Sequence, residues 1–196
     1  MGKVGTGFST SLDGFIAGPN GDVGSLFDWY FGGDTDYTMP SGDMTLKVSP
    51  QSAELLRESH ERTGALVVGR RHFDHAGAWG GRHPMDVPVF VVTHTVPQEW
   101  AYEGSPFAFV TEDVESAVGQ ARATAGDKDV GVGGADVAQQ CIKAGLIDEI
   151  GVDLVPVLFG EGIRFFDRLG TGQIDLESTR VVEAPGVTHL RFRVVR

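Results

Sequence analysis

Cysteine and positive charge are scarce in this sequence. The single cysteine among 196 residues, Cys141, excludes a disulfide within the chain and any metal site built from cysteines alone, and we expect a reducing, cytoplasmic location. The 16 Lys and Arg residues are outnumbered by 27 Asp and Glu residues, which gives a net charge of -11. Because so acidic a surface repels phosphate backbones and anionic lipids, we expect neither nucleic acid nor a membrane as a partner.

Long apolar runs are absent as well. No stretch approaches the roughly 20 residues of a transmembrane helix, and the first residues lack the charged-then-apolar pattern of a secretory signal. Hydrophobic residues make up 41% and charged residues 22% of the chain, values that indicate a globular protein rather than a disordered one. No repeat or linker divides the sequence, so its length predicts one domain over residues 1–196.

What is present is an alternation of apolar runs that predict strands and helices in turn. A Gly-rich loop is expected at 14–24, a short helical segment at 26–31, and a terminal hairpin from strands 174–184 and 187–195. The other expected strands are 4–8, 65–68, 88–93, 107–110, 129–132 and 147–155, and the helices are 49–64, one around 114–121 and one around 137–142. This order predicts a three-layer α/β fold with a mixed, mostly parallel sheet.

The clearest chemical motif is a glycine pair where a buried strand meets a helix, at Gly133 and Gly134. Glycines let a phosphate approach the backbone closely, and a helix N-terminus offers free N–H groups. The motif departs from the dinucleotide fingerprint because Asp136 takes the place of its third glycine, and Asp153 matches the expected ribose carboxylate only loosely. A turn needed only for close packing remains an equal alternative.

Two further motifs follow other predicted strands. Arg70 and Arg71 are consecutive arginines in an acidic chain and suit a phosphate monoester, although each could instead pair with Asp74 or with the acidic residues of 22–43. The third motif is Thr93-His94-Thr95. Because ligands of open α/β sheets collect at the carboxyl ends of strands, the shared placement of the three motifs predicts a ligand with two linked phosphates and a separate third one.

The remaining histidines do not indicate a metal or a hydrolase. His72, Asp74, His75 and His83 resemble a metal motif superficially, but no further ligand accompanies them, and we expect no metal. His60 and His189 are predicted to be ordinary surface or hairpin residues. Without a G-x-S-x-G motif, no serine is placed as a nucleophile.

Several segments together resemble a known family. The segment Ser11-Leu12-Asp13-Gly14-Phe15-Ile16-Ala17 is similar to the first strand and loop of dihydrofolate-reductase-like proteins, and most similar to the C-terminal reductase domain of the bifunctional riboflavin-biosynthesis deaminase–reductase. The segments 67–73, 130–135, 146–149 and 156–162 match the same pattern in the same order, so the resemblance covers essentially the whole chain. It implies a three-layer dihydrofolate-reductase-like fold with an eight-stranded sheet.

The resemblance also implies an NADPH site. Its implied cofactor residues are Gly69, Arg70, Arg71 and His72 near the ribose phosphates, Thr93, His94 and Thr95 near the adenosine, Val132, Gly133, Gly134, Ala135 and Asp136 at the pyrophosphate, and Ile16 and Ala17 along the nicotinamide.

On the substrate side the resemblance implies a role for Asp13 as the catalytic or substrate-orienting carboxylate, with Asp28 and Trp29 as one wall. A turn-forming role for Asp13 in an Asp-Gly pair is an equal alternative. The expected activity is NADPH-dependent hydride transfer to a C=N or C=O group of a pyrimidine, pterin or flavin precursor, as in 5-amino-6-(5-phosphoribosylamino)uracil reductase. The alternative is a dimeric NADPH-binding sensor without turnover. The resemblance also implies a homodimer, and the apolar runs 150–159 and 187–195 would suit an interface between two copies. Helices that cover both faces of the sheet are an equal alternative for these runs.

Overall fold

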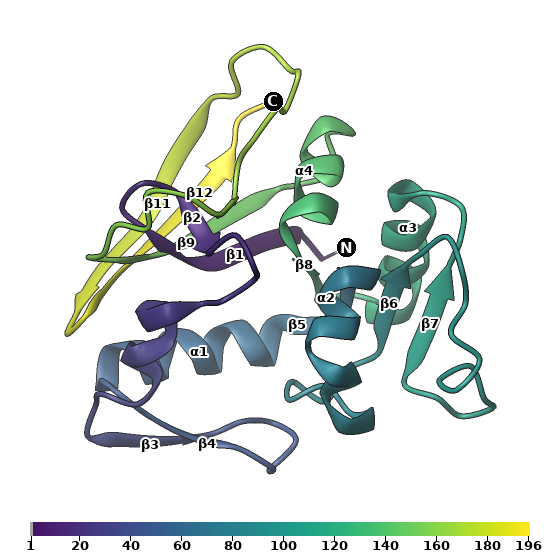
Figure 1. The fold of residues 1–196 in the computed structure, drawn as a ribbon, viewed down its shortest axis with the longest axis horizontal. Coiled ribbons are helices and arrows are strands. Elements are labelled where there is room, and N and C mark those ends of the chain that lie inside the picture. Colours follow the sequence, from purple (N-terminus) through teal and green to yellow (C-terminus); the bar gives the residue numbers. More distant parts are fainter. Residues whose placement is uncertain (1) are drawn as a thin grey trace.

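The computed structural model describes residues 2–196 and contains a mixed sheet of eight strands (Figure 1). The spatial order of the strands is β11-β12-β9-β1-β8-β5-β6-β7. Their bounds are β1 (Val4–Ser11), β5 (Thr63–Gly69), β6 (Val89–Val92), β7 (Phe107–Val110), β8 (Asp129–Gly133), β9 (Glu149–Val155), β11 (Leu176–Ala184) and β12 (Val187–Val194). The expected α/β fold with a mostly parallel sheet is confirmed.

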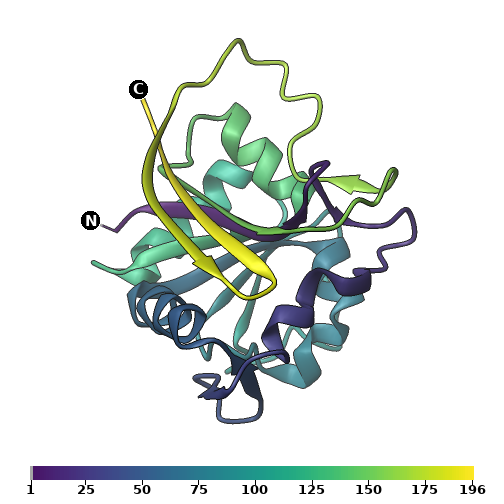
Figure 2. The ribbon, with the colours of Figure 1, turned by 90° about the vertical axis from the view of Figure 1, so that its left-hand side faces the viewer.

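Six neighbouring strands, from β9 to β7, run parallel, and the hairpin β11–β12 joins them antiparallel through β12. The hairpin curves along one side of the molecule, in yellow in Figure 2. Its turn contains Gly186 with a φ of 77°, a left-handed conformation that glycine adopts without strain. The result is a sheet whose parallel strands all present their carboxyl ends at one edge.

Helices cover both faces of the sheet. Alternate residues of β5 separate the layers: Ala65 and Val67 pack with α3 (Val114–Ala125) and α4 (Ala135–Lys143), whereas Leu66 and Val68 pack with α2 (Arg70–His75). The second face also carries α1 (Pro50–Arg62) and two 3₁₀ helices, η1 (Gly24–Tyr30) and η2 (Gly77–Gly81). The apolar side chains on this second face form two separate clusters, one around η1 and one around α2.

Local sequence explains where the helices begin. The Ser49 side chain accepts a hydrogen bond from the Ser52 backbone N–H, and Pro50 occupies the first turn, where its missing N–H does no harm. Asp113 caps α3 in the same way, accepting a 2.8 Å hydrogen bond from Ser116 N. None of the helices within residues 2–196 has the length and apolarity needed to span a membrane.

The segment between η1 and α1, for which the sequence predicted no strand, is not an open loop. It contains a small hairpin of β3 (Thr35–Thr38) and β4 (Thr45–Val48), whose Tyr37, Leu46 and Val48 are buried. The strands have only four residues each, too few for their alternation to be seen among polar neighbours. The loop 14–24 likewise contains β2 (Phe15–Ala17), which pairs with β10 (Ile163–Arg164).

Several predicted boundaries also needed correction. The first strand, expected over 4–8, runs to Ser11, and the strand expected over 65–68 begins at Thr63. The helix expected over 49–64 ends at Arg62, because Thr63 and Gly64 already belong to β5. The strand expected from 147 begins at Glu149, and the strand expected from 174 begins at Leu176.

Candidate cofactor and substrate site

The three predicted motifs lie at one edge of the sheet. Strands β8, β5 and β6 are neighbours, and they end at Gly133, Gly69 and Val92. The residues that follow, 134–136, 70–72 and 93–95, therefore emerge side by side at the carboxyl edge. This is where ligands bind in open α/β sheets.

The turn between β8 and α4 can receive a phosphate. Gly134 has a φ of 90° and precedes α4, whose first N–H groups have no partner within the helix. A Cβ on Gly133 would lie 3.2 Å from Val68 and 3.3 Å from the His72 ring, so a larger residue would crowd both. Asp136 is exposed beside the turn, where its carboxylate accepts a 3.0 Å hydrogen bond from Gln140.

His72 lies against this turn. Its Nδ1 is buried without a hydrogen-bond partner among residues 2–196. Burial lowers the pKa of the imidazole more than the nearby Gly133 backbone raises it, and the neighbouring His75 lowers it further, so the neutral ring is favoured. Trp79 of η2 packs edge-on against the ring, with 5.6 Å between centroids.

The two consecutive arginines at the start of α2, Arg70 and Arg71, differ in their contacts. Arg70 donates from Nε to Asp74 at 2.7 Å and from Nη1 to the Thr95 carbonyl at 2.9 Å. The expected pairing alternative is therefore correct for Arg70. Arg71 and His94 are exposed and make no hydrogen bond or ion pair within the described chain.

The Thr93 hydroxyl is used within its own turn. It donates to the Thr95 carbonyl at 2.9 Å and accepts from Thr95 N at 3.3 Å. It thus shapes the corner, while Arg71 and His94 remain free to meet an anion.

Ile16 and Ala17 lie on β2. Ala17 is buried and pairs with Ile163, and Ile16 is half-buried against the main core. A Cβ on Gly162 would lie 2.1 Å from the Ala17 carbonyl, so β10 and β2 approach as closely as glycine permits. This contact fixes the predicted nicotinamide wall against the end of β1.

Asp13 is engaged on both of its carboxylate oxygens. Oδ1 accepts from the Ser11 hydroxyl at 2.6 Å and from Phe159 N at 3.2 Å, and Oδ2 accepts from Gly160 N at 2.7 Å. These hydrogen bonds, led by the one from Ser11, lower the pKa of Asp13 to about 2. The geometry favours the turn-forming alternative over proton delivery.

The two residues predicted to form one wall of the substrate site, Asp28 and Trp29, lie in different environments. Asp28 is exposed, whereas Trp29 is 5% exposed and donates from Nε1 to Ser9 Oγ at 3.0 Å. Trp29 therefore packs over the end of β1 and forms part of the second-face core.

His189 lies on a strand of the terminal hairpin, as one part of the prediction had it, but it is not an ordinary surface residue. His189 is 2% exposed on β12, where its Nδ1 lies 2.7 Å from Asp153 Oδ1 and its Nε2 lies 2.9 Å from Ser52 Oγ. Arg191 Nη1 donates to the same Asp153 oxygen at 2.8 Å. His60, the other histidine of that prediction, is half-buried with its Nδ1 2.7 Å from the Tyr37 hydroxyl. Sequence reasoning missed the group around Asp153, although a lone carboxylate inside the apolar run 150–155 was a signal.

The sheet is open to solvent next to this group. Gly7 is exposed although β1 lies inside the sheet, and its partner on β9 is Gly151. A Cβ on Gly151 would lie 3.3 Å from Arg191 Nη1, so the guanidinium lies directly over this glycine. The exposed part of the sheet face is therefore at Gly7, next to the Arg191 guanidinium.

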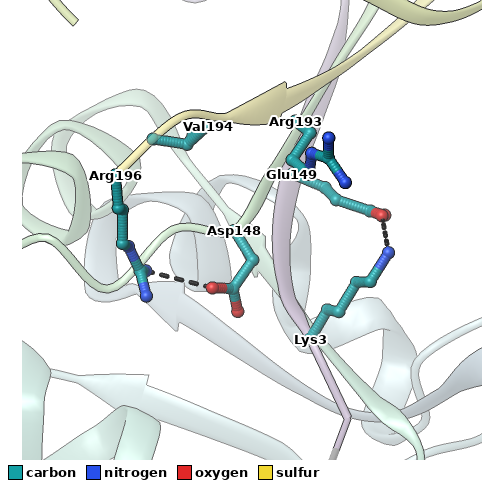
Figure 3. Close-up of a pocket in the computed structure, with 6 residues that line it drawn as sticks. All are labelled: Lys3, Asp148, Glu149, Arg193, Val194 and Arg196. Atoms are coloured by element: carbon teal, nitrogen blue, oxygen red, sulfur yellow. Dashed lines mark hydrogen bonds and ion pairs between the residues drawn. The ribbon is translucent and has the colours of Figure 1, made fainter. Parts of the chain in front are cut away.

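Two cavities lie outside this arrangement. One of about 360 Å³ lies between the loop after β2 and residues 158–161, with Pro19, Asn20 and Leu158 among its lining. Another of about 230 Å³ lies at the opposite, amino edge of the parallel strands (Figure 3). Its charges are all paired, Lys3 with Glu149 and Arg196 with Asp148 inside the cavity, and Arg193 with Glu177 outside it, so no charged group is free for a ligand. No three potential metal ligands cluster anywhere in residues 2–196.

The fold, together with the three motifs at the carboxyl edge of its sheet, defines an α/β protein of the dihydrofolate-reductase-like class. The sequence profile of the RibD C-terminal domain matches residues 3–190, and the chain belongs to that family. This confirms the resemblance drawn from the motifs.

Similar proteins cover nearly the whole chain. A protein from Shewanella sp. PV-4, assigned provisionally to riboflavin biosynthesis, has a structure with a TM-score of 0.73 and 25% identity, covering 99% of each chain. The dihydrofolate reductase of Enterococcus faecalis, solved with NADP(H) and RAB-propyl, shares the fold with a TM-score of 0.58 and 16% identity, covering 99% of this chain and 97% of that one. The uncharacterized protein YwjB of Bacillus subtilis is 22% identical over 162 residues, 82% of this chain and 80% of YwjB.

Proposed function

We propose that this protein is an NADPH-dependent reductase that transfers hydride to a C=N or C=O group of a small heterocycle of the pyrimidine, pterin or flavin-precursor type. The family is one of reductases, and a structural relative, the Enterococcus enzyme, was solved with NADP(H). The observation that carries the proposal is the shared edge: a glycine turn before α4 stands next to a corner with an unpaired arginine.

The residues present fit this cofactor. The Gly133–Gly134 turn and the first N–H groups of α4 would hold the pyrophosphate, because no side chain stands between them and the ligand. Arg71 and His94 would meet the phosphate on the adenosine ribose, and Ile16 would flank the nicotinamide. The bound nicotinamide supplies the hydride. The chain aligns cofactor and substrate and excludes water.

A titration with NADPH and NADH, followed by fluorescence, tests the cofactor assignment. We expect NADPH to bind more tightly than NADH. Oxidation of NADPH, followed by absorbance with uracils, pterins and flavin precursors, then tests turnover. Equal or absent binding of the two cofactors would contradict the proposal.

One observation favours the alternative of cofactor binding without turnover. Both oxygens of Asp13, the carboxylate expected near the substrate, are held by the chain, and its pKa of about 2 makes it a poor proton donor. Tight NADPH binding with no oxidation by any tested compound would support a sensor.

We also propose that two copies associate through the terminal hairpin. Strand β11 forms the sheet edge, and Val181 and Leu176 on it are 61% and 43% exposed. Exposed apolar side chains on an edge strand favour association. Light scattering at micromolar concentration should give twice the chain mass, and a monomer mass would exclude this interface.

A further inference from the structure

We propose that Asp153 and Arg191 recognise the substrate heterocycle: Asp153 Oδ2 accepts a hydrogen bond from a ring N–H, and Arg191 donates one to the adjacent carbonyl. This inference rests on the proposed reductase function and deepens it by naming the substrate edge that is read. The substrate class is thereby a ring with an N–H next to a C=O, as in a uracil or a pterin.

Asp153 is held firmly by one oxygen only. Both His189 Nδ1 and Arg191 Nη1 meet Oδ1, at 2.7 and 2.8 Å, while no donor among residues 2–196 reaches Oδ2. The side chain is 18% exposed, so a ligand can reach this free acceptor. Asp13 differs, because both of its oxygens are occupied.

Hydrogen bonds link Ser49, Ser52, His189 and Asp153 in a chain, and the contacts of His189 Nε2 set the direction in which the protons are donated. The Ser49 hydroxyl donates to Ser52 Oγ at 3.0 Å, and Ser52 Oγ lies 2.9 Å from His189 Nε2. With Ser52 donating to Nε2, the N–H on His189 Nδ1 donates to Asp153 Oδ1. Although burial opposes the charge, the hydrogen bond from His189 and the positive charge of Arg191 lower the pKa of Asp153 overall, so the carboxylate is ionised and acts only as an acceptor.

Arg191 supplies the complementary donor. Its guanidinium lies over Gly151, and its side chain is 33% exposed. Nη1 is used by Asp153 and by the Leu190 carbonyl, which leaves Nε and Nη2 without partners among residues 2–196. An acceptor and a donor beside each other match a ring edge that presents N–H next to C=O.

The position suits a substrate beside the cofactor. Asp153 pairs in register with Ser9, two residues before β1 ends, next to the solvent-exposed Gly7. Strand β9 is separated from β8, which carries the glycine turn, by β1 alone. Two strand spacings amount to roughly 10 Å, which leaves a flat ring and a nicotinamide room to lie side by side. Trp29 and Tyr30 of η1 pack against the same region, with the Trp29 ring 5.1 Å from that of His189.

The test compares uracil with 1,3-dimethyluracil, which keeps both carbonyls and loses both N–H groups. Dissociation constants are measured by ligand-observed NMR with NADPH present. We expect the wild type to bind uracil roughly tenfold or more tightly than the dimethyl compound, because a hydrogen bond to a charged group is lost. This comparison needs no variant and therefore does not depend on how a variant folds.

The variant Asp153→Asn then tests whether Asp153 is responsible for the preference for uracil. Since His189 and Arg191 both donate to Oδ1, the amide oxygen stays there and the NH₂ group replaces the free acceptor with a donor. We expect the uracil preference to fall to about one, while NADPH affinity stays at the wild-type value. Asp148→Asn is the matched control, since Asp148 directly precedes β9 at the opposite edge and is paired with Arg196.

The outcomes separate the two proposals. A wild type that binds uracil no better than dimethyluracil, or Asp153→Asn with the preference retained, overturns the recognition pair while the reductase function stands. A wild type that fails to bind NADPH overturns the reductase function itself.

Discussion

The carboxylate of Asp13 and the backbone N–H of Gly160 are joined by a 2.7 Å hydrogen bond that spans 147 positions of the sequence. It ties the loop after β1 to the segment that follows β9. Arg164 reinforces the tie, because its Nη1 donates to the Asp13 carbonyl at 3.2 Å and its guanidinium lies 4.4 Å from the Phe15 ring centroid. The wall of the candidate nicotinamide site thus depends on contacts between distant segments.

Loss of the Asp13 hydrogen bonds should loosen the segment 159–160 without removing a proton donor from the site. In Asp13→Ala we expect faster amide hydrogen exchange at Phe159 and Gly160, because their N–H groups lose their acceptor. Exchange measured by mass spectrometry checks this, and Asp43→Ala, an exposed change in the turn after β3, should leave it unaltered. Unchanged protection in Asp13→Ala would show that the carboxylate does not hold the segment.

The glycine turn allows a test with a control at the other end of the same helix. Gly134 and Gly145 both have positive φ, 90° and 67°, before and after α4. Valine at either position should lower stability by roughly 1–3 kcal/mol through backbone strain. Only Gly134→Val should also weaken NADPH binding, by roughly tenfold or more, because its side chain would stand before the free N–H groups of α4.

Thermal melting and NADPH titration separate the two effects. Equal loss of NADPH affinity in Gly134→Val and Gly145→Val would indicate a general effect of instability. In that case the pyrophosphate would not lie at this turn.

His83 should make the protein sensitive to acid. Burial lowers its pKa from 6.5 to about 4, and its Nδ1 accepts a 3.1 Å hydrogen bond from Met85 N. The unfolded chain binds a proton at this residue near pH 6.5 whereas the native state does not, so stability falls as the pH drops from 6.5 toward 4. In His83→Asn, whose side-chain oxygen can still accept from Met85, this fall should shrink by roughly 1–3 kcal/mol.

Urea unfolding at pH 7 and pH 4.5 measures the fall for each variant. His60, whose pKa burial also lowers to about 4, adds a loss of the same sign, so the single variant should not abolish the slope. His94→Asn, at an exposed position, is the control. An acid slope in His83→Asn equal to that of the wild type would contradict the prediction.

The elements with long, regular patterns could be predicted from the sequence, and the side-chain pairings could not. The buried strands β5, β6 and β8 and the glycine turn after β8 are local features, and each was placed within about two residues. The contact between Asp153 and His189 joins residues 36 positions apart, and it depends on the register of β12 against β9. A shift of one residue would turn His189 to the other face, so composition alone could not reveal this contact.

The roles of the two arginines were also left open by the sequence. Both were assigned to the cofactor, and pairing with Asp74 was an alternative for each of them. Helical geometry separates them: Arg70 lies four residues before Asp74 on α2 and pairs with it, whereas Arg71 points elsewhere on the helix and is exposed.

Arg71 should therefore be the residue that distinguishes NADPH from NADH. Hydrogen bonds to a charged group contribute roughly 1.5–3 kcal/mol, so Arg71→Ala should weaken NADPH binding by roughly ten- to a hundredfold. NADH, which lacks the ribose phosphate, should bind as before. Arg70→Ala should weaken both cofactors alike, because Arg70 holds the Thr95 carbonyl and shapes the corner. Dissociation constants at fixed ionic strength decide the matter, since salt screens the phosphate contribution. Arg168→Ala, on a 92% exposed side chain, is the control. An unchanged NADPH to NADH ratio in Arg71→Ala would remove this corner from the cofactor site.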